Sequence, residues 1–97
     1  MAARRYLVDK AYQWYRRAYD LGKSDSSVYW ESAALRLGKA HEEGEGCTQS
    51  FQEAKGWYSR AVAGLSAAVR EGTWYRGAFK SAEAGLARAE QEVSGKY

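Results

Sequence analysis

The feature that most constrains the fold of this chain is a five-residue pattern, Trp-Tyr-x-x-Ala, which occurs at residues 14–18, 57–61 and 74–78. The first two copies lie 43 residues apart, and this spacing is within the range of helical-hairpin repeats. The third copy follows the second by only 17 residues, the length of one helix and a turn. We therefore interpret the first two Trp-Tyr pairs as equivalent packing positions, and the third as a break in the period.

Apolar residues recur at helical spacing along most of the chain, and no strand pattern competes with them. Proline is absent and glycine occurs ten times, which favours helices joined by glycine-based turns. The predicted helices span about 4–21, 28–43, 50–71 and 74–93. We expect an all-α fold of about four antiparallel helices, arranged as helical hairpins in one small domain, 1–97.

The first predicted helix has a broad apolar face made of two neighbouring stripes. One stripe contains Leu7, Ala11, Trp14, Ala18 and Leu21; the other contains Val8, Tyr12, Tyr15 and Tyr19. A face of this width indicates contacts with two neighbouring elements rather than one. Gly22 is the expected stop of this helix, and Gly64 is expected to kink or end the third. Ser50 and Glu53 have the spacing of a capping box at the start of the third helix.

Charge is mild overall but uneven along the chain. The formal net charge is +3, with +3 over residues 1–22, −3 over 31–53 and +4 over 54–80. The two basic segments leave nucleic-acid binding as an alternative, and the acidic segment counts against it. The N-terminal residues lack the apolar stretch of a secretory signal, and no apolar run is long enough for a membrane helix. We expect a cytoplasmic protein with no membrane association.

Catalytic and metal-binding chemistry finds little support in the sequence. His41 and Cys47 are the one histidine and the one cysteine, six residues apart across a glycine-rich loop. Two such ligands without a second pair do not form a zinc site, and a nucleophile without an orienting partner does not form a catalytic dyad. We therefore predict no enzymatic activity and no cofactor, and we expect His41 to be partly buried.

The stretch 37–61, LGKAHEEGEGCTQSFQEAKGWYSRA, resembles a Sel-like repeat, a relative of the tetratricopeptide repeat. The matching positions are Leu37, Gly38, Gly44, Gly46, Ala54, Trp57, Tyr58 and Ala61. Residues 11–22 resemble the second helix of a preceding repeat. The resemblance implies that Trp14 and Trp57 fill wedges between hairpins. We expect positive φ angles at Gly44 and Gly46 in a tight interhelical turn.

Resemblance to this family implies binding of another protein, often as an adaptor. The predicted contact surface combines surplus aromatic side chains with exposed cations. It consists of Arg16, Arg17, Tyr19, Tyr29, Trp30, Trp74, Arg76 and Lys80. A small phage or mobile-element inhibitor, or an immunity-type protein that occludes a larger complex, is the alternative. Self-association is a further possibility, because a short repeat array leaves an apolar end face.

Overall fold

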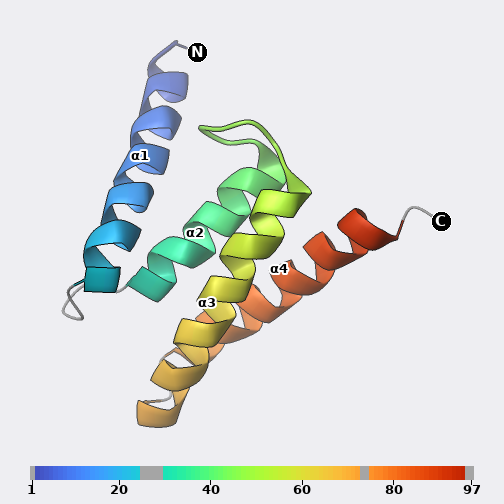
Figure 1. The fold of residues 1–97 in the computed structure, drawn as a ribbon. Helices are drawn as coiled ribbons and strands as arrows, with labels where there is room; N and C mark the ends of the chain where they lie inside the picture. Colours follow the sequence, from blue (N-terminus) through green and yellow to red (C-terminus); the bar gives the residue numbers. More distant parts are fainter. Residues whose placement is uncertain (1, 25–29, 73–74, 96–97) are drawn as a thin grey trace.

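The computed structural model describes residues 2–24, 30–72 and 75–95, and it contains four helices and no strand within these ranges. The helices are α1 (Ala2–Ser24), α2 (Trp30–Glu43), α3 (Phe51–Glu71) and α4 (Arg76–Ser94). Figure 1 shows them in chain order across the molecule. The all-α helical-hairpin fold class predicted from the sequence is therefore confirmed.

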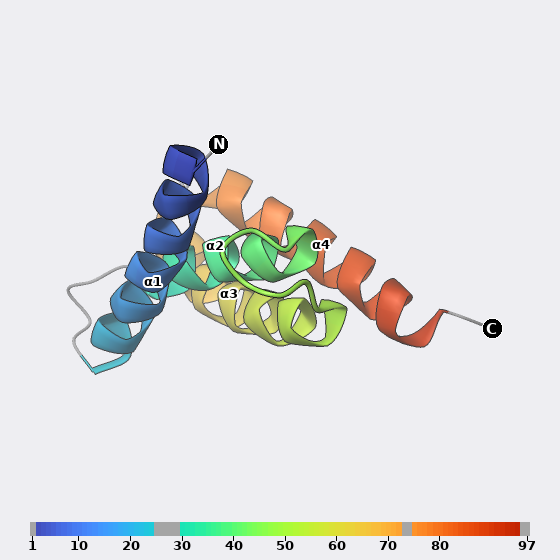
Figure 2. The ribbon, with the colours of Figure 1, turned by 90° about the horizontal axis from the view of Figure 1, so that it is seen from above.

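The antiparallel hairpin of α2 and α3 forms the centre of the molecule (Figure 1). Helix α1 packs against α2, whereas α4 packs against α3 and, over a shorter length, against α2. In Figure 2, α1 and α4 lie on opposite sides of the central hairpin. These two outer helices do not pack against each other.

The loop between α2 and α3 is built around two glycines in the left-handed region. Gly44 has φ 71° and Gly46 has φ 77°, as expected from the sequence. The Ser50 side chain caps α3 by accepting a hydrogen bond from the Glu53 amide at 3.1 Å. At Gly46, an added Cβ would lie 2.8 Å from the Val8 carbonyl oxygen. The loop therefore packs closely against α1 as well as joining α2 to α3.

The core contains the repeat positions predicted from the sequence. Tyr58, Leu37 and Leu65 are its largest fully buried side chains. Small residues surround Tyr58, and an added Cβ at Gly38 would lie 2.8 Å from its ring. The predicted repeat positions that are buried are Leu37, Gly38, Ala54, Trp57, Tyr58 and Ala61. These side chains and glycines let α2 and α3 approach closely around one aromatic ring.

Gly22 and Gly64 do not end their helices. Helix α1 continues to Ser24 and α3 runs to Glu71. Both glycines instead make room for Trp30: an added Cβ would meet the Trp30 backbone nitrogen at 3.0 Å from Gly22 and the Trp30 ring at 2.7 Å from Gly64. The missing side chains therefore form a slot for Trp30 between α1 and α3.

Only one of the two apolar stripes of α1 faces the core. Tyr19 is 6% exposed, and Val8, Tyr12 and Tyr15 are half-buried. The large side chains of the other stripe face outward, with Leu7 and Trp14 each 65% exposed and Leu21 54% exposed, whereas its alanines, Ala11 and Ala18, are half-buried. The prediction that Trp14 is a packing wedge equivalent to Trp57 is therefore wrong. Helix α1 packs along α2, and it touches α3 through side chains such as the Tyr19 ring against the Trp57 ring.

Candidate protein-binding surface

Trp57 occupies the junction between α3 and α1. Its ring meets the Tyr19 ring edge-on at 4.8 Å, and Tyr19 meets Trp30 in the same way at 5.9 Å. The Arg60 guanidinium lies over the Trp57 ring at 4.5 Å, and that of Arg16 at 5.4 Å. Offset and edge-to-face aromatic pairs and cations over a Trp face stabilise such a cluster. The cluster joins α1 to α3 through side chains.

A cluster of polar side chains links α2, α3 and α4. The Glu42 carboxylate accepts a hydrogen bond from the Tyr58 hydroxyl at 2.6 Å and is held by Arg88 from Nε at 2.7 Å and Nη2 at 3.1 Å. The Arg88 hydrogen bond lowers the pKa of Glu42, partly against the effect of burial. Burial and the bond to Glu42 raise the pKa of Tyr58. The bidentate arrangement links α2, α3 and α4.

Replacing Glu42 with glutamine is expected to destabilise the fold at neutral pH and to matter less in acid. A carboxyl group whose folded pKa is lowered stabilises the fold above its unfolded pKa, and this contribution is lost as the pH falls through the folded pKa. The difference in unfolding free energy between wild type and Glu42→Gln should therefore shrink below about pH 4.5. Urea unfolding across this range measures the difference, and a difference that stays constant would contradict the role given to Glu42.

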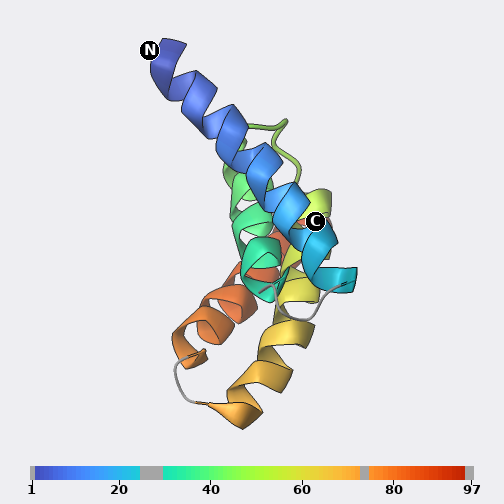
Figure 3. The ribbon, with the colours of Figure 1, turned by 90° about the vertical axis from the view of Figure 1, so that its left-hand side faces the viewer.

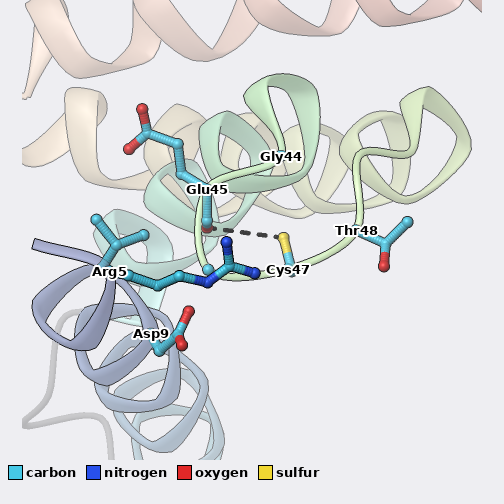
Figure 4. Close-up of a pocket in the computed structure, with 8 residues that line it drawn as sticks. Arg5, Asp9, Gly44, Glu45, Cys47 and Thr48 are labelled. Carbon is cyan, nitrogen blue, oxygen red and sulfur yellow. Dashed lines mark hydrogen bonds between the residues drawn. The ribbon is translucent and has the colours of Figure 1, made fainter. Parts of the chain in front are cut away.

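His41 is 8% exposed and belongs to a polar contact between α2, α1 and the loop. Its Nε2 lies 2.9 Å from the Tyr12 hydroxyl, and its Nδ1 lies 3.5 Å from Cys47 Sγ. An open pocket beside this contact is lined by Arg5, Asp9 and the loop residues 44–48 (Figure 4). His41 is thus satisfied within the fold, as the sequence predicted for a partly buried packing role.

The Cys47 thiol is half-buried. Burial raises the pKa of the Cys47 thiol, with a further contribution from Glu53, so the reactive thiolate is disfavoured. The Cys47 thiol also contacts the Glu45 carbonyl oxygen at 3.8 Å (Figure 4). Within the described ranges, no three His, Cys, Asp or Glu side chains gather in a way that would hold a metal ion.

Those predicted contact residues that the structure describes do not form one surface. Arg16 and Arg17 are exposed on α1, whereas Arg76 and Lys80 are exposed at the start of α4 on the far side of the hairpin. The hydrogen bond with Tyr12 raises the pKa of Arg16, and its guanidinium lies over Trp57.

The aromatic members of the predicted surface have different outcomes. Tyr19 is in the core, and Trp30 is half-buried in its slot between two glycines. Both side chains therefore serve packing and are not free contact residues, contrary to the prediction. Tyr29 and Trp74 lie outside the described residues.

The structure reveals an exposed apolar surface that the sequence prediction assigned to the core. It consists of Leu7, Trp14 and Leu21 and is called the α1 stripe below; these residues are spaced by seven. Beside it lies a groove between α1 and α2, lined by Ala11, Tyr15 and residues of α2 that include Arg36 and Lys39. The regular spacing of seven can be seen in the sequence, but the sequence does not indicate whether these side chains face the core or the solvent.

Comparison with known families accounts for the hairpin and for α1. The Sel1 repeat model matches residues 8–23 and 31–64, which together are more than half of the chain. The chain belongs to the Sel1 repeat family. No curated protein and no solved structure matches it. The first Sel1 match lies within α1, and the second covers α2, the glycine loop and most of α3.

Sel1 repeats are generally protein–protein interaction modules and are typically non-enzymatic. Helix α4 lies outside both Sel1 matches and covers the far side of the hairpin. Among the described residues, no helix has the length and apolar character needed to cross a membrane.

Proposed function

We propose that this chain is a non-enzymatic interaction module that binds another protein on the surface of its Sel1 repeats and acts as an adaptor. The observation that carries the proposal is the Sel1 match over α1, α2 and α3. The large exposed apolar side chains of α1 support it, because exposed apolar residues that are grouped together mark interaction sites. The partner would bind by surface complementarity. The aromatic contacts of Trp57 and the hydrogen bonds of Glu42 hold the helices that form this surface in place.

Fold-dependent capture of a protein tests this function. The immobilised full chain is incubated with a lysate of the source organism, and retained proteins are quantified by mass spectrometry. The matched control is Leu65→Asp, which places a charge at a fully buried position and removes the folded surface. We expect at least one protein to be retained by wild type and lost with the control. Equal retention by both chains, or no retention above the bare matrix, would contradict the proposal.

A further inference from the structure

We propose that the α1 stripe and the adjoining α1–α2 groove dock an acidic amphipathic helix of the partner protein. This inference rests on the proposed function and gives it a surface and a ligand chemistry. Figure 3 looks at the α1 side of the molecule and shows α1 in front, with no other described helix over it. No described helix therefore covers this side of α1.

The α1 stripe has the form that helix packing requires. Successive residues of the stripe are seven apart, so each lies two turns beyond the last on nearly the same side of α1. Ala11 lies four residues after Leu7 and three before Trp14, so it fills the space between them on the side of the groove. The large side chains thus stand in a row beside Ala11, and the stripe from Leu7 to Leu21 is long enough to contact a helix over about 20 Å.

The second repeat shows how a tyrosine equivalent to one in the groove is enclosed by two helices. Tyr58 of α3 is enclosed between Gly38 of α2 and Gly85 of α4, and its side chain is fully buried. Tyr15 of α1 stands 43 residues earlier, at the same repeat position. It is half-buried and lines the groove, where α2 is the helix packed along α1. In this comparison α2 stands beside Tyr15 as α4 stands beside Tyr58, so a further helix with a small residue opposite Tyr15 would complete this site as Gly38 of α2 completes that of Tyr58.

Charge identifies the occupant as acidic. Lys10 lies between Leu7 and Trp14 on the solvent side of the stripe, three residues from one and four from the other, and is exposed. Arg17 holds the same position between Trp14 and Leu21. Across the groove, Arg36 and Lys39 of α2 are exposed as well. Cations therefore border the apolar surface on both sides and favour a helix with Asp and Glu at its flanks.

The acidic residues near the groove lie at one end of it. Glu43 and Glu45 belong to the end of α2 and the loop, beside the N-terminal half of α1. They favour a basic residue at that end of the docked helix. A docked helix is thereby given one preferred direction along the groove.

A second copy of this chain is a poorer occupant. Two α1 stripes placed against each other would bring Lys10 and Arg17 of one copy close to the same cations of the other. The outer side of α4 exposes three acidic residues, Glu83, Glu90 and Glu92, but its exposed apolar residues are small apart from Val93, which is 36% exposed and is its one large exposed hydrophobic residue within the described ranges. The α1 stripe of a second copy therefore lacks acidic flanks, and α4 of a second copy lacks a row of large apolar side chains.

A displayed library of helical peptides tests the proposal on the full chain. The peptides carry Leu, Ala and Gly on one face and either Glu or Lys at each flanking position. We expect selection on wild type to enrich peptides with Glu at most flanking positions. We also expect the Kd of a selected peptide to rise at least tenfold with Trp14→Glu and to remain unchanged with Ala84→Glu. The control places the same charge at an exposed position of α4.

Other outcomes would overturn the docking site. These are enrichment of Lys-flanked peptides, the absence of any enriched peptide, or affinity that does not change with Trp14→Glu. Sedimentation of wild type and of Trp14→Glu measures the oligomeric state as a further test. If wild type were a dimer and Trp14→Glu a monomer, the α1 stripe would bind a second copy of this chain. If a host protein is captured in a fold-dependent way but equally by Trp14→Glu, the adaptor function stands and this surface is rejected.

Discussion

Replacing Trp57 with alanine is expected to lower the free energy of unfolding by about 3–5 kcal/mol, the range for removing a buried aromatic side chain. Trp57 is 5% exposed and supports the ring of Tyr19 as well as the guanidinium of Arg60. Small domains are stable by only about 5–15 kcal/mol, so this loss would consume a large part of the stability. Urea unfolding followed by far-ultraviolet circular dichroism gives the value.

The matched control is Trp14→Ala, at the same position of the repeat. Because Trp14 is 65% exposed, its removal should change the unfolding free energy by no more than about 0.5 kcal/mol. Trp57→Phe keeps an aromatic ring in the core but removes Nε1, which is buried without a hydrogen-bond partner in the structure. We expect this change to cost less than Trp57→Ala. If Trp14→Ala and Trp57→Ala lowered the unfolding free energy by similar amounts, the two Trp-Tyr motifs would have the same environment, and the burial of Trp57 alone would be contradicted.

Replacing Gly85 with alanine is expected to destabilise the fold by about 1–3 kcal/mol, the range for overpacking a core. A Cβ at this position would collide with the Tyr58 ring, against which Gly38 also packs closely. The ring has little room to withdraw, because its hydroxyl is bound to Glu42 at 2.6 Å. Thermal and urea unfolding both report the loss.

Gly77→Ala on the same helix is the control for Gly85→Ala. An added Cβ at Gly77 meets no atom within 4 Å, and Gly77 has no positive φ. Alanine should stabilise the chain there by about 0.4–1 kcal/mol, because it reduces the conformational freedom of the unfolded state. Destabilisation by both variants to the same extent would remove the special role of Tyr58 packing.

The helices and the centre of the core could be predicted because they depend on residues that are close together in the sequence. Gly38, Tyr58 and Ala61 lie on regular apolar faces, and the turn glycines Gly44 and Gly46 stand at fixed places between two such faces. Capping of α3 by Ser50 likewise depends on residues within one turn. Periodicity and capping chemistry are enough to place features of this kind.

The outward stripe of α1 could not be predicted in the same way. Both stripes of α1 are apolar, and periodicity identifies a face without identifying the neighbour that covers it. Trp57 is buried because α1 supplies Tyr19 beside it, whereas no described helix packs on the side of α1 that carries Trp14. The same sequence motif therefore has two environments, which depend on its place in the array.

Contacts between distant residues account for the remaining differences. The sequence places Trp30 on a binding surface as a surplus aromatic side chain, yet Gly22 and Gly64 form a slot for it from two other helices. The ion pair of Glu42 and Arg88 joins residues 46 positions apart. A single sequence does not indicate such pairs, because they arise only once the helices are packed.

Fluorine NMR of the chain labelled with 5-fluorotryptophan, titrated with an acidic peptide selected on wild type, tests the docking surface most directly. Single Trp→Phe variants assign the resonances. We predict that the Trp14 resonance is solvent-exposed in the free chain and shifts as the peptide binds, while the Trp57 resonance stays in place. A Trp14 resonance that does not move at saturating peptide, or a Trp57 resonance that moves as far, would contradict the account.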